Sequence, residues 1–304
     1  MQVKEFIRKK ARRLTKAVLP GFDGAPLDVV LKLTAKGLVG RGVLVTRASS
    51  IAFNMLMAVL PASIFLFTLI PFIPVQNFQT DLITLFENIM PANAYSFLES
   101  TIVDVITNRS GTLLIVMFFA TIVFSTNGIH ALMHGFVTSS HEFKSRNWFQ
   151  QRKIAILLLL LILLMFSISG GLIILSRTVV GRLVELKVLR LNLVFYVVMI
   201  FKWALIVAMA FFAISTLYYL VPLQKKDFRY FSPGSVLATA LFILTSMGFS
   251  AYVNNFGQYN KLYGSIGTLM VIMIWLYLNS IALLVGFELN VSIKAAIAEM
   301  ETKA

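Results

Sequence analysis

The sequence predicts an all-α polytopic membrane protein with amphipathic interfacial helices, and three observations lead to that prediction. Of the 304 residues, 58% are hydrophobic and 13% are charged, whereas soluble domains have about 45–50% apolar and about 25% charged residues. Six stretches can each cross a bilayer as a helix, which takes about 20 apolar residues. No ten-residue segments alternate with the period of two expected of a membrane β-barrel. The composition excludes a soluble enzyme and a disordered chain, and the absence of cysteine excludes a disulfide-stapled module.

The six expected spans form a transmembrane domain over residues 48–290, between a basic region at 1–47 and a tail at 291–304. Charged residues are scarce in each span, and the stretch from Ile154 to Ser176 has none. The expected spans are 48–72, 112–137, 154–175, 193–221, 233–253 and 265–288. An even number of spans places both termini on one side of the membrane.

The distribution of Lys and Arg predicts which side that is. With the termini inside, 20 of the 27 Lys and Arg residues lie in inner segments and 6 lie in outer loops, although the loop 176–192 holds four of those six. Such an excess marks the cytoplasmic side. We therefore expect a multi-pass protein of the cell inner membrane with both termini in the cytoplasm.

The basic N-terminal region carries amphipathic helical patterns. Residues 3–18 place one apolar stripe opposite many cations, and after a break at Pro20-Gly21 a second stripe follows in Leu27, Val30, Leu31 and Leu38. Basic amphipathic helices bind anionic lipid surfaces. We expect this region to contact the anionic inner leaflet, so membrane lipids are the expected partners. An RNA-binding arm is the alternative, but no known module is present and we expect no nucleic-acid partner.

The loop at 73–111 is longer than an ordinary connection. It reads as two amphipathic helices separated by Pro91, with a net charge of −3. An acidic surface gains nothing from anionic lipid, so this outer hairpin should pack on the ends of the spans. A structural lid and a gate or partner surface are both compatible with the pattern.

Four ordered pieces of sequence carry a family resemblance across about residues 45–292. They are Arg47-Ala48-Ser49-Ser50-Ile51-Ala52-Phe53-Asn54 with Leu60-Pro61; Tyr218-Tyr219-Leu220-Val221-Pro222 with Ser232-Pro233-Gly234; Tyr252-Val253-Asn254-Asn255-Phe256 with Tyr259-Asn260 and Tyr263-Gly264-Ser265-Ile266-Gly267; and Trp275-Leu276-Tyr277-Leu278 with Gly286-Phe287-Glu288-Leu289-Asn290. Together they resemble the YihY / virulence factor BrkB family of bacterial inner-membrane proteins, once labelled ribonuclease BN. One departure is Asn54, where the family often has tyrosine. The resemblance implies a six-span inner-membrane protein and no settled mechanism.

The residues do not support the ribonuclease label. A metal-dependent nuclease needs clustered carboxylates or histidines, whereas the inner carboxylates are scattered. His130 and His134, four residues apart, form a possible ligand pair with no third ligand nearby in sequence. No phosphate-binding loop, zinc motif or nucleophile elbow is present. We therefore predict a non-enzyme with no catalytic residues, metal or cofactor.

Polar residues inside the expected spans are the candidate binding residues, because polar groups are costly in lipid and usually face the bundle interior. Lys202 lies about nine residues into its span, where it either extends to the headgroups or lines an interior that attracts anions. For the asparagines, packing between helices is the alternative, and Glu288 could equally lie at the headgroups. These candidates are Lys202, Asn54, Asn127, His130, His134, Asn279 and Glu288.

The outer turn between the last two spans adds further candidates. It is dense in amide and phenol groups, and glycines follow it: Asn254, Asn255, Tyr259, Asn260 and Tyr263. Such a turn could bind an anionic headgroup or a sugar, or it could be only a tight turn. Two functions remain open. One is envelope transport or lipid handling, with a lipid or anionic small molecule as substrate, through a cavity among the spans. The other is a non-transporting scaffold that recruits partners.

Overall fold

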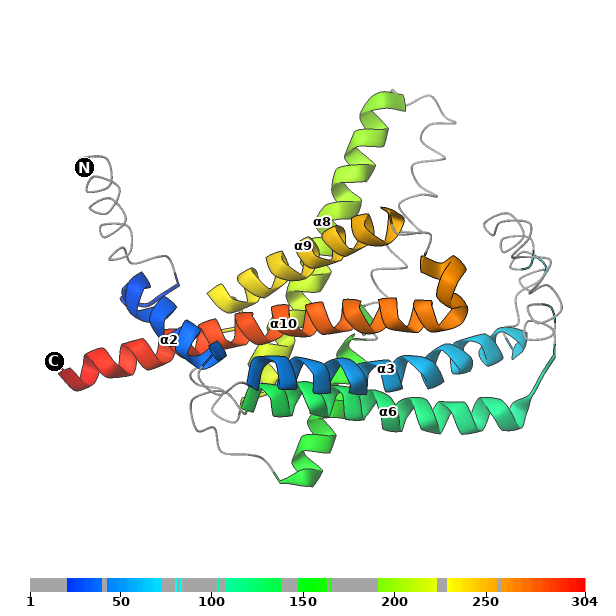
Figure 1. The fold of residues 1–304 in the computed structure, drawn as a ribbon, viewed down its shortest axis with the longest axis horizontal. Coiled ribbons are helices and arrows are strands. Elements are labelled where there is room, and N and C mark those ends of the chain that lie inside the picture. The colour runs from blue at the N-terminus through cyan, green and yellow to red at the C-terminus, as the bar shows by residue number, and fades with distance from the viewer. Residues whose placement is uncertain are drawn as a thin grey trace. The chain divides into compact units, whose positions relative to one another are not determined.

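Every element in the described part of the chain is a helix, as the sequence predicts (Figure 1). This computed structural model describes the residues 21–39, 43–72, 80, 83, 103, 108–137, 147–162, 164–165, 191–222, 229–255 and 259–303. The basic segment 3–18, most of the outer hairpin 73–111 and most of the loop 176–192 lie outside the described residues, so their predictions stay untested.

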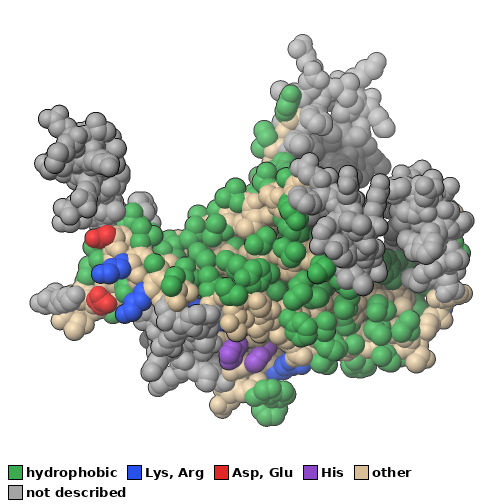
Figure 2. Space-filling model, viewed as in Figure 1, with side chains coloured by type: hydrophobic (Ala, Val, Ile, Leu, Met, Phe, Trp, Pro, Cys, Tyr) green, Lys and Arg blue, Asp and Glu red, His purple; other side chains and the backbone are tan. Residues whose placement is uncertain are grey.

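Five helices within the described ranges are long and apolar enough to cross a membrane. They are α3 (Val43–Leu69), α6 (Gly111–Val137), α8 (Leu191–Leu220), α9 (Pro233–Asn255) and α10 (Tyr259–Lys303). α6, α9 and α10 contain the spans expected at 112–137, 233–253 and 265–288, and α3 and α8 cover most of those expected at 48–72 and 193–221. Half of the expected span at 154–175 lies outside the described residues, and the described residues 148–162 are helical. Hydrophobic side chains cover much of the surface in view (Figure 2), as helices surrounded by lipid require.

The chain divides into two compact units, Met1–Phe53 with Ile129–Ala304, and Asn54–Gly128. In the second unit, the later part of α3 packs against α6. The rings of Phe65 and Phe118 lie 5.6 Å apart, and Arg109 Nε donates a hydrogen bond of 3.1 Å to the Pro71 carbonyl in the 3-10 turn Ile70–Phe72. Although Pro61 cannot donate a backbone hydrogen bond, α3 continues through it to Leu69.

In the first unit, α10 is the element against which α9 and α2 (Leu27–Val39) pack. The apolar side of α2 contacts the C-terminal part of α10, so part of the second amphipathic stripe packs on protein. Val30 is buried in this contact, together with Phe22, Ala25, Leu289, Ile293 and Ala296. Leu31, which the stripe includes, is 50% exposed. The tail expected at 291–304 is helical as far as Lys303.

Local sequence signals explain where α2 and α9 begin. The turn before α2 has positive φ at Gly21 (86°) and Gly24 (89°), a conformation that glycine adopts without strain. At the start of α9, the Ser232 hydroxyl accepts a hydrogen bond from the Ser235 amide at 3.2 Å, and Pro233 occupies the first helical position. A serine cap followed by proline is a common helix start.

Candidate functional site

A buried polar cluster lies in the first unit, among the ends of α3, α6 and α9 and the middle of α10. Its two charged members are Arg47 in α3 and Glu288 in α10, whose side chains are 8% and 1% exposed. Ionisable groups buried among membrane helices are rare and mark functional sites. We define the polar cluster as Arg47, Gly135, Tyr218, Ser232, Gly234, Glu288 and Asn290.

Arg47 connects three helices. Its Nη1 donates a hydrogen bond of 3.2 Å to the Gly135 carbonyl, and its charge is attracted by the Glu288 carboxylate. Because α6 ends at Val137, the Gly135 carbonyl is one of the last four that have no partner within the helix. A cation is also favoured at this negative end of the helix dipole. Arg47 therefore caps α6 and at the same time offsets the charge of Glu288.

Aromatic side chains fill the space next to these charges. The Phe136 and Phe287 rings stack at 4.5 Å, and the Tyr218 ring meets each of them edge-on at 5.5 Å. The Tyr218 hydroxyl donates a hydrogen bond of 2.5 Å to the Leu283 carbonyl in α10. These geometries are the favoured ones for aromatic pairs. They bring α6, α8 and α10 together and leave the described centre of the cluster well packed.

The closest contact in the cluster is between α9 and α10. The Gly234 amide donates to Asn290 Oδ1 at 2.8 Å, and Asn290 Nδ2 donates to the Ser232 hydroxyl at 2.8 Å. A Cβ atom on Gly286 would lie 2.5 Å from the Gly234 carbonyl oxygen, so both positions need glycine. The Asn290 side chain thus satisfies an amide in the first turn of α9 that has no partner inside the helix.

The members of the polar cluster come largely from the sequence pieces that carry the family resemblance. Arg47 belongs to the first piece, Tyr218, Ser232 and Gly234 to the second, and Glu288 and Asn290 to the fourth. Only Glu288 was also a candidate binding residue. The motif pieces were the signal for the others except Gly135, which lies in none of them, because nothing in hydropathy or spacing shows that these residues meet. The side chain of Glu288 is buried in the protein, and its depth relative to the headgroups stays a prediction.

Asn279 lies apart from these residues and joins α9 to α10. It accepts a hydrogen bond from Thr245 Oγ1 at 3.0 Å and donates one to the Trp275 carbonyl at 2.9 Å. Trp275 Nε1 donates to Ser246 Oγ at 3.3 Å close by. Packing between helices therefore accounts for the Asn279 side chain.

The histidine pair on α6 is divided between two environments. His130 Nε2 lies 2.5 Å from Gln151 Oε1, whereas the side chain of His134 is exposed. Asn54 and Asn127, in the second unit, are half-buried. Among the residues that the structure describes, no three His, Asp or Glu side chains form a group that could hold a metal ion.

The remaining candidates have described backbones, but their side chains lie outside the described part of the structure. Lys202 lies within α8, and the expected outer turn is largely helical, because α9 continues to Asn255 and α10 begins at Tyr259. Asn254 and Asn255 end one helix, while Tyr259, Asn260 and Tyr263 start the next. A binding role for these residues stays a prediction.

The polar cluster is suited to pairing a buried cation with an anionic group. Arg47 presents a buried cation whose charge is offset by Glu288, and an anionic group could take the place of that carboxylate. The exposed apolar side chains of Leu269, Met270, Met273 and Ile274 are on the earlier part of α10. α10 thus carries exposed apolar side chains in its earlier part and a buried carboxylate nearer its middle.

Comparison with known proteins gives one family and several relatives. The family model described as "Virulence factor BrkB" matches residues 40–304. The "Putative ribonuclease-like protein YfkH" of Bacillus subtilis is 29% identical over 245 residues, 81% of this chain and 88% of that protein. A "UPF0761 membrane protein" of Vibrio atlanticus is 38% identical over 92 residues, 30% of this chain and 28% of that protein. Another, of Pseudoalteromonas translucida, is 39% identical over 77 residues, 25% of this chain and 26% of that protein. No solved structure matches significantly.

Proposed function

Because the chain belongs to the virulence factor BrkB family of membrane proteins, we propose that it handles a lipid or transports a small anionic molecule of the bacterial envelope, through the six expected spans. The observation that supports this proposal is the buried pair of Arg47 and Glu288. Burying two charges costs several kcal/mol per ion, about as much as their attraction returns. A structure that needed only to span the membrane would gain stability from apolar side chains there.

The pair suits an amphipathic anion. The charged head of such a substrate would pair with Arg47 while Glu288 moves away, and its chains would lie on the apolar surface of the earlier part of α10. A metal-dependent ribonuclease needs clustered metal ligands, whereas the polar cluster has one carboxylate, Glu288, and no histidine. We accordingly propose a non-enzyme.

The proposed location is the inner membrane, with both termini in the cytoplasm, as the excess of inner Lys and Arg predicts. Reporter fusions at Thr302 and in the loop 73–111 should therefore give opposite signals. An outward-reporting fusion at Thr302 would overturn this topology.

A scaffold without transport is the second candidate function, and one observation favours it. The C-terminal part of α10 continues beyond Glu288 to Lys303 and packs against α2. An exposed ion pair between Asp23 and Arg229, 2.9 Å apart, joins the turn before α2 to the segment before α9. Such a folded platform could present a surface to a cytoplasmic partner.

Reconstitution distinguishes the two candidates. The purified protein in phospholipid vesicles should accelerate either the exchange of fluorescent phospholipids between leaflets, measured by dithionite quenching, or the efflux of a trapped carboxylate dye. Glu288→Gln should lower that activity at least tenfold. Glu299→Gln, which changes an exposed carboxylate on the same helix, should leave it unchanged. Vesicles in which the wild-type protein is folded and accelerates neither process would refute transport and support the scaffold.

A further inference from the structure

A second group of cationic side chains lies outside the polar cluster, where the end of α6 meets the helical segment 148–162. The hydrogen bond between His130 and Gln151 joins these two helices. Histidines lie on one helix, while cations and exposed aromatic rings lie on the other. We define the basic-aromatic patch as His130, His134, Trp148, Phe149, Arg152 and Lys153.

The position of the patch along both helices matches a membrane interface. The uncharged apolar run of the segment 148–162 begins at Ile154, so Trp148 to Lys153 precede it. His134 lies in the last turn of α6, which ends at Val137. Aromatic residues concentrate at the level of the headgroups, where one side of the ring is wet and the other apolar. Both helices therefore bring the patch to the same boundary.

Exposure and charge give the patch its binding character. Trp148 and Phe149 are 62% and 73% exposed, and their rings meet edge-on at 4.9 Å. Arg152 is half-buried, and the next residue, Lys153, is exposed. No Asp or Glu occurs in 129–137 or 147–162, the described stretches that form the patch. Cations and aromatics without any carboxylate complement an anionic, amphipathic surface.

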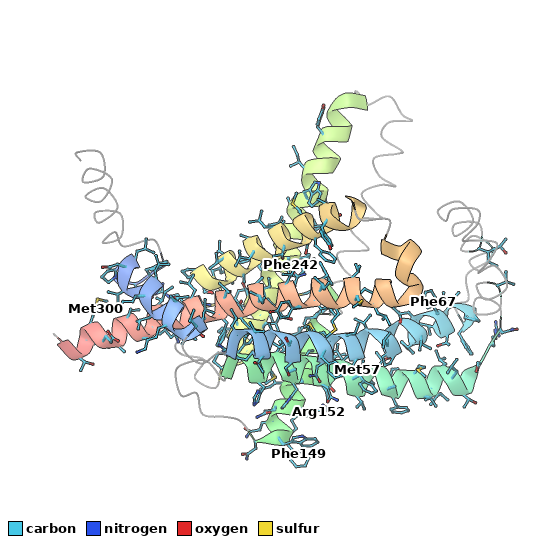
Figure 3. The ribbon with its side chains drawn as sticks, viewed as in Figure 1. Met57, Phe67, Phe149, Arg152, Phe242 and Met300 are labelled. Carbon is cyan, nitrogen blue, oxygen red and sulfur yellow. The ribbon has the colours of Figure 1, made fainter. Side chains whose placement is uncertain are left out.

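The figures agree with this arrangement. In Figure 3, Phe149 lies at the free end of its helix, and Arg152 lies closer to α6. In Figure 2, the two described histidines form neighbouring purple patches, with the blue of a cation beside them and an apolar green end below. Arg152 thus lies on the side of the helix end nearer α6, while Phe149 lies at the end further from α6.

We propose that the basic-aromatic patch binds the headgroup of an acidic phospholipid, independently of the transport proposed above. Arg152 and Lys153 hold the phosphate, His134 adds a ring N–H donor, and Trp148 and Phe149 insert beside the glycerol and the first methylenes of the acyl chains. Each cation near an anionic leaflet raises affinity by about fivefold. Removing Arg152 and Lys153 should therefore lower the preference for acidic lipid by at least fivefold.

Tryptophan fluorescence tests the proposal directly. In a Trp203→Phe, Trp275→Phe background, Trp148 is the only tryptophan of the three in the chain. Vesicles with brominated phosphatidylglycerol should quench its fluorescence more strongly than vesicles with brominated phosphatidylcholine at equal mole fraction. Arg152→Gln with Lys153→Gln should abolish that difference. Lys32→Gln with Lys36→Gln, which removes two exposed cations from α2, should preserve it.

A second measurement uses the chain with its tryptophans intact. Native mass spectrometry of the detergent-solubilised protein should show bound phosphatidylglycerol at several-fold lower phosphatidylglycerol concentration for the wild type than for the Arg152→Gln, Lys153→Gln variant. Equal binding of phosphatidylglycerol and phosphatidylcholine to the wild type would overturn the proposal. So would a preference for short RNA over phosphatidylglycerol in direct competition.

Discussion

Two helix contacts in this protein are built in opposite ways, although each includes a glycine. Between α9 and α10, Gly234 and Gly286 face each other so closely that an added Cβ would strike backbone atoms. Between α3 and α6 in the second unit, a Cβ on Gly128 would meet Asn54, Met55 and Ala58 at the ordinary distances of 3.5, 3.6 and 3.8 Å. Only the first contact uses the missing side chain to bring two backbones together.

The difference teaches where glycine is required and where it is only tolerated. At α9 and α10 the close approach also lets Asn290 reach the Gly234 amide and Ser232. Small residues that permit such approach, with polar side chains that bond across it, are the usual means of holding helices together in lipid. The α3–α6 contact depends on ordinary packing instead, so it should accept a methyl group.

The largest expected effect is that of Gly234→Ala. The new Cβ would overlap the Gly286 carbonyl oxygen and lie 2.5 Å from Asn290 Cγ, and neither backbone can move alone. We expect a loss of more than about 3 kcal/mol in unfolding free energy, or no folded protein. Circular dichroism during thermal unfolding in detergent measures it. Gly248→Ala on the same helix is the control, because nothing lies within 4 Å of that Cβ, and its unfolding temperature should not fall.

Asn290→Ala should have the next largest effect. It leaves the buried Gly234 amide without its acceptor and removes one of the donors to the Ser232 hydroxyl, which keeps the Ser235 amide. An orphaned buried polar group costs about 1–3 kcal/mol, so we expect about 2 kcal/mol of destabilisation in the same unfolding experiment. An unchanged unfolding temperature would mean that these two hydrogen bonds do not hold α9 on α10.

Gly135→Ala tests an intermediate case. The added methyl group would lie 2.9 Å from Ile51 Cδ1, the end of a side chain that can turn aside. We expect a loss of about 1 kcal/mol. Ile51→Val removes Cδ1, so the double variant should recover most of the loss caused by Gly135→Ala, as a double-mutant cycle measures. Strict additivity of the two changes would show that they do not share this contact.

The smallest expected effect is that of Gly128→Ala, and its sign is reversed. The site has room for a methyl group, and alanine is favoured over glycine inside a helix by up to about 1 kcal/mol. We expect an unchanged or slightly higher unfolding temperature. A marked loss would show that α3 and α6 approach as closely as α9 and α10, which would remove the contrast between the two contacts.

The helices were predictable because hydropathy and local signals act over short distances. The span expected at 112–137 is α6 at Gly111–Val137, and the one expected at 233–253 is α9 at Pro233–Asn255. The start of α9 is marked by Ser232 and Pro233, which set a cap by themselves. The continuation of α10 to Lys303 was missed, because charged residues after Glu288 resemble a tail, although contact with α2 stabilises the helix there.

The polar cluster was predictable only in part. Arg47 counted in the sequence as one more inner cation, since its neighbour in the fold, Glu288, lies 241 residues further along. Hydropathy reports composition in a window and cannot report which distant residues meet. Asn279 and Glu288 were selected by one rule, yet Asn279 forms a hydrogen bond across a helix contact, whereas Glu288 is buried where its charge acts on Arg47. Packing decides between those outcomes.

The length of α10 has a mechanical consequence. Its 45 residues make a helical path of roughly 68 Å at about 1.5 Å per residue, more than twice the hydrocarbon thickness of about 30 Å. In Figure 1 only its first turns diverge from the long straight remainder. A stiff rod of that kind acts as a lever, because a change of tilt within the bilayer necessarily displaces the end that carries Met300. Since α2 packs against that end, a change in the tilt of α10 within the bilayer would also move α2, through direct contact between the two helices.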